Sequence, residues 1–349
     1  MINVALCGLR HLHPDGYMAL FAQVPEMRVV AASEADELRR REFAAKFGVP
    51  VYTTYQEALE KHDVQLAAIF LPHAECPEAV EFAAAAGAHV LVEKPMAADA
   101  AGIGRMIAAC ERAGVVLTTP YLWRYHQMSR EIKRLVTDGV VGEVIALEGR
   151  MAAGKPVRYQ QASPWMLEKK KSGGGAMHNL GVHWIDLFRW LLEDEVVSAY
   201  GDIRIITPGI DVEDQSFALL TFSRGARAYL DISYTVPASY PHGRDLFVGI
   251  RGTAGTIAWS PAFEGAADEM FLSSEKKEYK DAPWRRYAFD NLVVPGYCGI
   301  LGVSYLRDLA ESLTAGRPPV IPGREGLKAL QVVEAVYQSA ALGRPVSLS

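Results

Sequence analysis

The first 120 residues alternate short apolar runs with segments of helical spacing, and this alternation constrains the fold more than any other feature. The apolar runs lie at residues 2–7, 28–32, 51–54, 66–71, 90–92 and 115–118. Runs that are apolar throughout are typical of parallel strands, because helices cover both faces of a parallel sheet. Strands that alternate with helices indicate an α/β chain. We therefore predict a doubly wound parallel sheet over residues 1–120.

The pattern changes after residue 120. Helical spacing recurs at residues 127–137, 176–192, 305–314 and 323–342. Strand-like stretches separated by turn residues lie at 143–151, 199–206, 215–222, 226–235, 245–251 and 256–259. Alternation of polar and apolar residues is typical of antiparallel sheets with one solvated face. We predict a second, α+β domain over residues 121–349, with an open, mainly antiparallel sheet.

Length and charge exclude several classes of function. A chain of 349 residues suggests two domains. Its net charge of −5 provides no basic field for nucleic acid, and no run approaches the roughly 18 consecutive apolar residues of a membrane span. No basic region precedes the first apolar run, so we expect no signal peptide. The cysteines lie far apart without a C-x-x-C pair, which favours reduced thiols in the cytoplasm: Cys7, Cys76, Cys110 and Cys298.

The turn after the first apolar run is where the pyrophosphate of a dinucleotide would rest. The fingerprint expected there is G-x-G-x-x-G, but this chain has Gly8-Leu-Arg10-His-Leu-His13, with two of the three glycines replaced. Arg10 must fold away or supply a cation to the phosphates. We place His11 and His13 in the neighbourhood of the phosphates or of the substrate, with His13 among the cofactor-binding residues. The alternative is a sheet that binds no nucleotide. His11 and His13 have no carboxylate or thiolate nearby in sequence, so we predict no metal site.

Glu34 comes at the end of the second apolar run. An acidic side chain at this position accepts both hydroxyls of a ribose and repels a 2′-phosphate. If a nicotinamide cofactor binds, Glu34 therefore favours NAD over NADP. The alternative is an ordinary solvated carboxylate that precedes a helix.

A charged pair, Glu93 and Lys94, follows the apolar run at residues 90–92, and Pro95 then fixes the backbone. Ligands of parallel sheets bind just beyond the carboxyl ends of the strands. We therefore expect this pair at a functional site. Leu71 and Pro72 end another apolar run and are expected to line the cofactor site for the same reason. The alternative for the charged pair is a surface ion pair that closes a strand.

The most informative stretch of the second half is Gly173-Gly-Gly-Ala-Met-His178-Asn179-Leu-Gly-Val-His183-Trp-Ile-Asp186. Asn179 and His183 are four residues apart and share one face of a helix, and Asp186 can also reach that face. His178 points about 100° away from Asn179. The alternative for His183 is a core histidine whose hydrogen bonds are satisfied, which is the commoner role of a histidine on an apolar helix.

These stretches together resemble the glucose–fructose oxidoreductase / inositol dehydrogenase (Gfo/Idh/MocA) family over the full length of the chain. The resemblance rests on Glu93-Lys94-Pro95 after a buried strand and on the later pattern Gly-Gly-Gly-x-x-x-Asn-x-Gly-x-His-x-x-Asp. Further matching stretches are residues 87–95, 123–125, 138–144, 251–256 and 334–346, together with Trp165 before the glycine run.

The resemblance implies an N-terminal Rossmann domain and a C-terminal domain that carries substrate and homo-oligomer contacts. It implies hydride transfer between NAD or NADP and a sugar, inositol or polyol carbon. By the family pattern, Lys94 contacts the reacting oxygen, Glu93 supports the nicotinamide ribose, and His183 exchanges the proton. These roles suit the residue types, because histidine titrates near neutral pH and an ammonium stabilises a developing alkoxide. We expect a homodimer or homotetramer.

The chain departs from the family pattern in two places. The family usually has an aspartate where Asn179 stands, and asparagine keeps the hydrogen bonding but has no charge and cannot act as a base. The glycine pair around Arg10 is also lost. We expect Arg124 to bind the cofactor, and the expected substrate-binding residues are Lys94, Tyr125, Arg158, Trp165, His178, Asn179 and His183. For the polar stretch 153–172, the alternative is a solvated loop.

The leading hypothesis is an NAD-dependent oxidoreductase acting on a sugar, sugar acid or cyclitol. Lys94 and His183 carry the chemistry in this hypothesis, and Asn179 orients them. One alternative is a glycoside hydrolase that retains NAD and uses transient oxidation. Another is a non-catalytic relative that senses a sugar or a nucleotide, which Asn179 and the altered glycine fingerprint motivate.

Overall fold

The computed structural model describes every residue except 238, 241–242, 262–267, 291 and 349. Its contacts divide the chain into two compact units, and neither unit is a continuous segment. The first unit comprises Met1–Leu122, Tyr159–Gly173 and Val294–Lys328, and the second comprises Trp123–Arg158, Gly174–Val293 and Ala329–Ser349. The expected boundary at residue 120 lies close to the first crossing, whereas two later segments return to the first unit.

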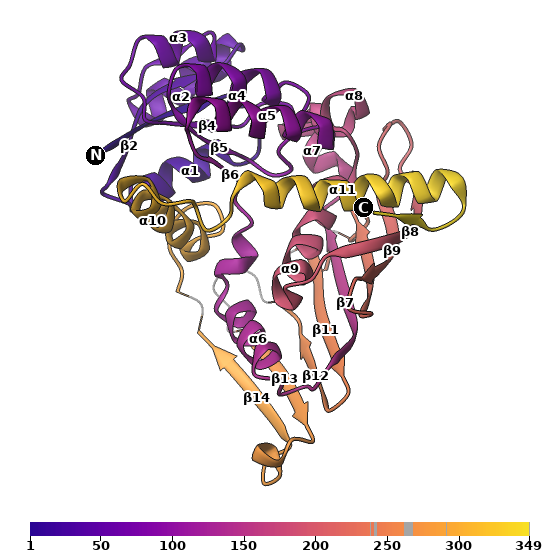
Figure 1. The fold of residues 1–349 in the computed structure, drawn as a ribbon. Helices are drawn as coiled ribbons and strands as arrows, with labels where there is room; N and C mark the ends of the chain where they lie inside the picture. Colours follow the sequence, from indigo (N-terminus) through magenta and orange to yellow (C-terminus); the bar gives the residue numbers. More distant parts are fainter. Residues whose placement is uncertain (238, 241–242, 262–267, 291, 349) are drawn as a thin grey trace. The chain divides into compact units, whose positions relative to one another are not determined.

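A six-stranded parallel sheet forms the centre of the first unit (Figure 1). Among the described residues its order is β3-β2-β1-β4-β5-β6. The strands are β1 (Ile2–Cys7), β2 (Met27–Ser33), β3 (Val51–Tyr52), β4 (Leu66–Ile69), β5 (His89–Val92) and β6 (Leu117–Thr118). The order reverses between β1 and β4, so the carboxyl ends of these strands form the topological switch point. The predicted doubly wound parallel sheet is confirmed.

Two helices of the first unit begin and end where the sequence places capping residues. The side chain of Asp36 caps α2 (Glu37–Phe47), and the helix ends at Gly48 with a φ of 68°. An aspartate and a glycine bound α5 (Ala100–Ala113) in the same way. The other helices are α1 (Pro14–Phe21), α3 (Tyr55–Glu60), α4 (Cys76–Ala85), η2 (Pro164–Leu167), α8 (Lys169–Ser172) and α10 (Ile300–Thr314).

A nine-stranded sheet forms the second unit, in the order β14-β13-β12-β11-β7-β10-β9-β8-β15 among the described residues. Its strands are β7 (Val144–Ala153), β8 (Val196–Arg204), β9 (Gln215–Phe222), β10 (Arg227–Ser233), β11 (Arg244–Gly252), β12 (Gly255–Trp259), β13 (Asp268–Ser274), β14 (Trp284–Phe289) and β15 (Val346–Ser347). β7 and β10 pair in parallel, and the other described pairs are antiparallel. The predicted open, mainly antiparallel sheet is confirmed.

Three strands of this sheet, β13, β14 and β15, are not predicted by our sequence analysis. β14 alternates exposed and half-buried residues without a buried face, and β15 is two residues long. Neither therefore carries the apolar alternation from which a strand can be recognised.

Helices α6 (Gln127–Thr137) and α9 (Val182–Leu192) contact each other, and α9 also contacts β7 (Figure 1). The turn that leads into α9, η3 (Met177–Gly181), is a π-helix, so the predicted helix over residues 176–192 is not uniformly α-helical. Elements at the crossings between units are η1 (Leu122–Tyr125), α7 (Pro156–Ala162) and α11 (Gly323–Leu342). Among the described residues, no helix has the length and apolar character needed to span a membrane.

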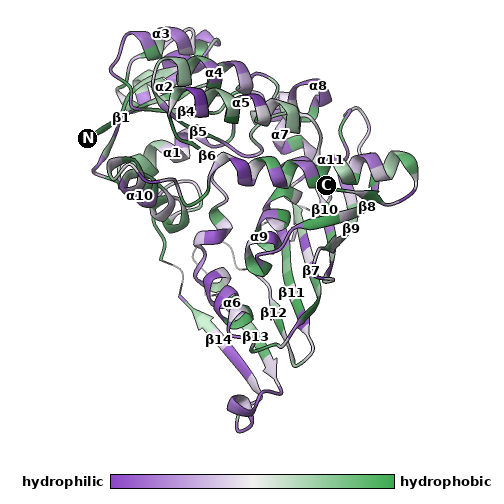
Figure 2. Cartoon of the chain, viewed as in Figure 1, coloured by the Kyte–Doolittle hydropathy of each residue, from purple (hydrophilic) through white to green (hydrophobic). Residues whose placement is uncertain are grey.

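Colouring by hydropathy shows hydrophobic residues along strands of the second sheet such as β11 and β12 (Figure 2). In the first unit, Val4, Leu6 and Leu91 are fully buried, as expected for strands that are covered on both faces. In the second unit, Leu220 of β9 is buried whereas the neighbouring Leu219 is 47% exposed. The second sheet therefore keeps one face toward solvent in the isolated chain.

Candidate cofactor and catalytic sites

Gly8 follows β1 and turns the chain toward α1. Its φ is +91°, and a Cβ at this position would lie 2.8 Å from Leu71 Cδ2 and 3.1 Å from the carbonyl oxygen of Phe70. Both the backbone conformation and the close approach therefore require glycine. The structure brings Gly8, Leu71 and Pro72 to the switch point between β1 and β4, which is where dinucleotides bind such sheets.

Arg10 stands where the second fingerprint glycine is expected. Its carbonyl oxygen accepts hydrogen bonds from Ser163 Oγ at 2.7 Å and from Trp165 Nε1 at 3.1 Å. Two such bonds, worth roughly 1 kcal/mol each, hold the turn although the glycine is missing. The Arg10 side chain is exposed, so it is accessible to a phosphate at this loop.

Trp165, which we expected beside the substrate, lies in the first unit and contacts the glycine loop through its indole N–H. The segment that carries it is attached to the sheet by two further hydrogen bonds. Ala74 N donates to the Lys171 carbonyl at 2.9 Å, and His73 Nδ1 donates to the Ser172 carbonyl at 2.7 Å. Trp165 is only 5% exposed, so this part of the polar stretch is not a solvated loop.

Glu34 is buried and accepts two backbone hydrogen bonds. Leu9 N donates to Oε2 at 2.8 Å, and Asp36 N donates to Oε1 at 3.0 Å. The first of these bonds links the end of β2 to the glycine loop. Arg40 binds the carbonyl oxygen of Glu34 at 2.9 Å rather than its carboxylate. Glu34 is therefore a fixed acceptor at the loop and not the solvated carboxylate of the alternative interpretation.

Glu93 and Lys94 are each 3% exposed, so the alternative of a surface ion pair is wrong. Glu93 Oε1 accepts the N–H of Lys94 at 3.0 Å, and Glu93 Oε2 lies 3.0 Å from His13 Nδ1. His13 also stacks on Tyr297, with 3.7 Å between the ring centroids. Burial raises the pKa of Glu93, and the charges of His11 and Lys94 oppose that rise. His13, which stands at the third glycine position of the fingerprint, thus contacts the Glu93 carboxylate.

Each glycine of the run at 173–175 faces a group that leaves no room for a side chain. A Cβ on Gly174 would overlap the hydroxyl of Tyr337, and a Cβ on Gly175 would overlap the carbonyl oxygen of Glu213. The Glu213 carboxylate also accepts the N–H of Gly175 at 2.8 Å, the N–H of Met177 at 2.9 Å and the Tyr337 hydroxyl at 2.8 Å. Glu213 therefore anchors η3, the turn that leads into α9.

Asn179 lies in the π-helical turn, and His183 lies in the first turn of α9. Both are nearly buried, at 7% and 9% exposure. Asn179 Nδ2 donates to the Tyr234 hydroxyl at 2.9 Å, and that hydroxyl donates to the Gly175 carbonyl at 3.2 Å. This chain of hydrogen bonds fixes which way the Asn179 amide points.

Arg124, which we expected to bind the cofactor, is buried in a bidentate ion pair with Asp186. Nε lies 2.9 Å from Oδ2 and Nη2 lies 2.5 Å from Oδ1. The pair joins η1 to α9 within the second unit. Asp186, which shares the sequence pattern of Asn179 and His183, thus has a structural partner.

The other expected substrate residues differ in exposure. Tyr125 is buried, and the Arg130 guanidinium lies 5.0 Å from its ring centroid. His178 is 1% exposed, and its backbone is hydrogen-bonded to Tyr337. Arg158 lies exposed on α7. Arg158 is therefore the member of this group that is accessible from solvent.

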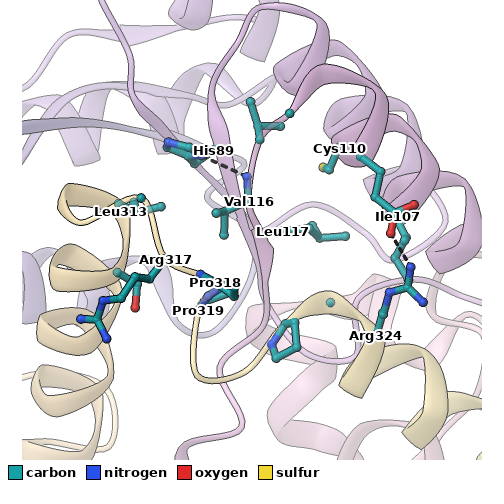
Figure 3. A pocket seen from close by; sticks show the side chains of 17 residues that line it. His89, Ile107, Cys110, Val116, Leu117, Leu313, Arg317, Pro318, Pro319 and Arg324 are labelled. Atoms are coloured by element: carbon teal, nitrogen blue, oxygen red, sulfur yellow. Dashed lines mark hydrogen bonds and ion pairs between the residues drawn. The ribbon is translucent and has the colours of Figure 1, made fainter.

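The part of the chain that the structure describes holds no group of three or more His, Cys, Asp or Glu side chains suited to a metal ion. It does hold a pocket of about 540 Å³ in the first unit (Figure 3). The pocket lies beside the amino ends of β5 and β6, where His89 Nδ1 accepts the N–H of Val116 at 3.0 Å and Arg324 pairs with Glu111. The candidate residues Glu93 and Lys94 follow the opposite end of β5, so this pocket is separate from the candidate site.

Sequence reasoning missed the residues that hold the two motifs in place. Ser163 and Trp165 secure the glycine loop, while Glu213, Tyr234 and Tyr337 secure the turn η3 that carries Asn179. Only Trp165 had a sequence signal, and it was assigned to the substrate. The others come from segments far along the chain, and nothing in their local pattern marks them.

Two family models match the chain. Residues 2–121 match the oxidoreductase family with an NAD-binding Rossmann fold, and residues 129–258 match the GFO/IDH/MocA C-terminal domain. A D-apiose dehydrogenase from Paraburkholderia graminis is 27% identical, covering 100% of this chain and 88% of the relative. The uncharacterized oxidoreductase ORF334 of Rhizobium meliloti is 31% identical over 77% of each chain.

Two further comparisons bear on cofactor and fold. A D-xylose 1-dehydrogenase (NADP(+)) of Haloferax volcanii is 25% identical over 93% of this chain and 94% of the relative. The crystal structure of an aldose-aldose oxidoreductase from Caulobacter crescentus complexed with glycerol has a TM-score of 0.83 at 26% identity, over 99% of each chain.

The fold and these matches define an NAD(P)-dependent dehydrogenase. Within this class, the chain belongs to the Gfo/Idh/MocA oxidoreductase family.

Proposed function

We propose that this protein is an NAD-dependent dehydrogenase that transfers a hydride between nicotinamide and a hydroxyl-bearing carbon of a sugar, sugar acid or cyclitol. The observation that carries the proposal is the burial of Lys94, at 3% exposure, beside Glu93 after the carboxyl end of β5. An ammonium in a site of low dielectric stabilises a developing alkoxide strongly. The relatives named for D-apiose and D-xylose support a sugar as substrate.

The second unit supplies the proton-transfer group in this proposal. His183 exchanges the hydroxyl proton, and Asn179 orients the site through hydrogen bonds. Tyr234 binds Asn179 Nδ2, which directs the amide oxygen to the opposite side. An amide has no charge, so Asn179 cannot stabilise an imidazolium as a carboxylate would. The nicotinamide, when bound, supplies the hydride chemistry.

We propose NAD rather than NADP because of the groups around Glu34. Its carboxylate lies at the end of β2 and is tied to the glycine loop through Leu9 N. The two neighbouring arginines have other partners: Arg40 binds backbone carbonyls, and Arg39 pairs with Asp15. A 2′-phosphate would therefore meet a carboxylate whose repulsion neither of these two arginines offsets.

The proposal includes a homodimer or homotetramer that forms through the exposed face of the second sheet. Tyr200, Leu219 and Tyr229 lie opposite one another across β8, β9 and β10, and they are 43%, 47% and 44% exposed. Such a contiguous apolar row is typical of a protein–protein interface. Cys7, Cys76 and Cys110 are buried free thiols in the described structure, which supports a reducing location such as the cytoplasm.

The test is a screen of aldoses, sugar acids and cyclitols with NAD, following the formation of NADH. Lys94→Met should lower kcat by roughly 10²- to 10³-fold, the usual effect of removing one electrostatic contact to a developing oxyanion. Lys61→Met is the matched control, because Lys61 forms an exposed ion pair with Glu57 in the same unit.

Two results would contradict the proposal. If the protein retains NAD through purification, cleaves glycosides and releases no NADH, the reaction is that of an NAD-dependent glycoside hydrolase. If Lys94→Met keeps full activity on the substrate that the screen identifies, Lys94 does not contact the reacting oxygen.

A further inference from the structure

His11 is a buried imidazole in the glycine loop, and one of its two ring nitrogens accepts a hydrogen bond. It is 5% exposed, and its Nδ1 accepts the N–H of His13 at 3.3 Å. The ring proton of the neutral form must therefore reside on Nε2. Among the residues that the structure describes, Nε2 is buried and has no hydrogen-bond partner.

The surroundings of His11 belong to the candidate cofactor site. Its ring lies 4.4 Å from that of His13, 5.9 Å from that of Trp165 and 6.3 Å from that of Phe70, measured between centroids. Glu93 and Lys94 are close enough to act on it electrostatically. All of these residues belong to the first unit.

The His11 ring is a neutral donor at physiological pH. Burial, together with the charges of His13 and Lys94, holds the pKa of His11 well below its usual range, and Glu93 only partly opposes this. A neutral imidazole with Nδ1 occupied can donate one hydrogen bond and accept none. It therefore suits an oxygen acceptor and cannot serve as a base at this position.

A buried donor without a partner costs roughly 1–3 kcal/mol, so a ligand acceptor at Nε2 would remove a penalty that the unliganded loop carries. The loop also needs such a donor. Arg10 replaces the second fingerprint glycine, and Ser163 and Trp165 fix its carbonyl. The backbone thus lacks the glycine that normally allows close approach to the phosphates.

We infer that His11 is a cofactor-binding residue whose Nε2–H donates to an oxygen of the pyrophosphate–ribose part of the dinucleotide. This inference rests on the proposed function, because it requires that a dinucleotide binds this loop. It adds a side-chain contact to a motif that normally binds its ligand through glycine backbone.

The experiment compares binding to the whole protein of NADH, ADP-ribose, ADP and AMP, by nicotinamide fluorescence or calorimetry. His11→Phe removes the donor and keeps a ring, whereas His11→Gln keeps an N–H near the position of Nε2. His89→Phe is the matched control. The imidazole of His89 also accepts a backbone N–H at Nδ1. It lines the pocket beside the amino ends of β5 and β6, whereas the glycine loop follows the carboxyl end of β1 (Figure 3).

His11→Phe should weaken NADH and ADP-ribose roughly tenfold, the value of about one hydrogen bond, and leave AMP within about twofold. His11→Gln should recover most of the loss, and His89→Phe should bind like the wild type. If ADP is weakened like ADP-ribose, the acceptor is a pyrophosphate oxygen; if only ADP-ribose is weakened, the acceptor is on the ribose. Either result supports the inference.

Three results would overturn the inference. Unchanged NADH affinity in His11→Phe would mean that Nε2 meets only water. An equal loss for AMP would mean that the substitution distorts the loop in general. A wild-type protein that binds no NADH would overturn the proposed function as well, whereas the first two results would leave that function intact.

Discussion

The two glycine motifs of this chain differ in how many of their glycines are present. The loop after β1 has lost two of the three fingerprint glycines, and the run before η3 has kept three in succession. In the loop, the hydroxyl of Ser163 and the indole of Trp165 hold the carbonyl of Arg10. These two side chains stabilise a turn that glycines normally form in this motif.

The glycine run shows why a glycine cannot always be replaced. Gly173 faces the backbone of Ala98, and Gly175 faces the backbone carbonyl of Glu213. Backbone cannot swing aside as a side chain can, so a Cβ has no place at either position. The comparison teaches that glycine is required where it meets backbone and is dispensable where a side chain has room, whether in solvent as at Arg10 or against other side chains as at His13.

The largest expected effect is that of Gly175→Ala. Its Cβ would overlap Glu213 and separate the carboxylate from the start of η3, so the free energy of unfolding should fall by more than about 3 kcal/mol. Urea denaturation measures this. Gly104→Ala in α5 is the control, since its Cβ would meet nothing within 4 Å, and it should be neutral or stabilising by up to about 1 kcal/mol. A mild effect of Gly175→Ala would break the comparison.

Ser163→Ala tests the compensation in the loop. Ser163 is fully buried and donates to Arg10, so its loss should lower the free energy of unfolding by about 1 kcal/mol and weaken NADH binding. Ser129 provides the control. Its hydroxyl is buried without a hydrogen-bond partner among the described residues, so Ser129→Ala should be neutral or stabilising. Equal losses in both variants would argue that the bond to Arg10 adds nothing.

Glu93 gives a pH dependence whose sign follows from its environment. Burial raises its pKa above the ordinary value of 4.5, so between that value and the folded-state pKa the folded protein binds more protons than the unfolded protein. Stability should therefore fall as pH rises through this window, on the order of 1 kcal/mol. Urea denaturation of the wild type and of Glu93→Gln should be compared from pH 4.5 upward. The free energy of unfolding of the wild type should fall relative to that of the variant as pH rises. A wild-type advantage that grows with pH would contradict it.

The smallest expected effect is that of Arg10→Gly, which restores the second fingerprint glycine. The exposed side chain packs against little, so the free energy of unfolding should fall by less than about 1 kcal/mol, mainly through the added freedom of the unfolded chain. Thermal unfolding measures this loss, and a titration with NADH tests separately whether Arg10 meets a phosphate. A loss of stability as large as that of Gly175→Ala would mean that both motifs tolerate substitution equally poorly, and the contrast between them would fail.

Much of the fold could be predicted because its signals are local. The apolar runs, the Asp36 cap and the Gly48 stop lie in the segments that they shape, and the structure has the parallel sheet and α2 where they were expected. β14 could not be predicted in the same way, since it lacks a buried face. Part of the candidate site could be predicted for the same reason. Glu93 and Lys94 were expected beyond the end of a strand, and the structure has them there, buried.

The sequence by itself determined the two kinds of sheet, one parallel and one mainly antiparallel, and the positions of the glycines. It also determined the chemical groups: an ammonium at Lys94, an imidazole at His183 and a neutral amide at Asn179. Only the tertiary structure decided which glycine was needed, that Arg124 is committed to Asp186, and that Glu213 holds the turn η3. These contacts join segments far apart in the chain. Hydrogen bonds and steric overlap depend on positions within a few tenths of an ångström, and no local pattern encodes such distances.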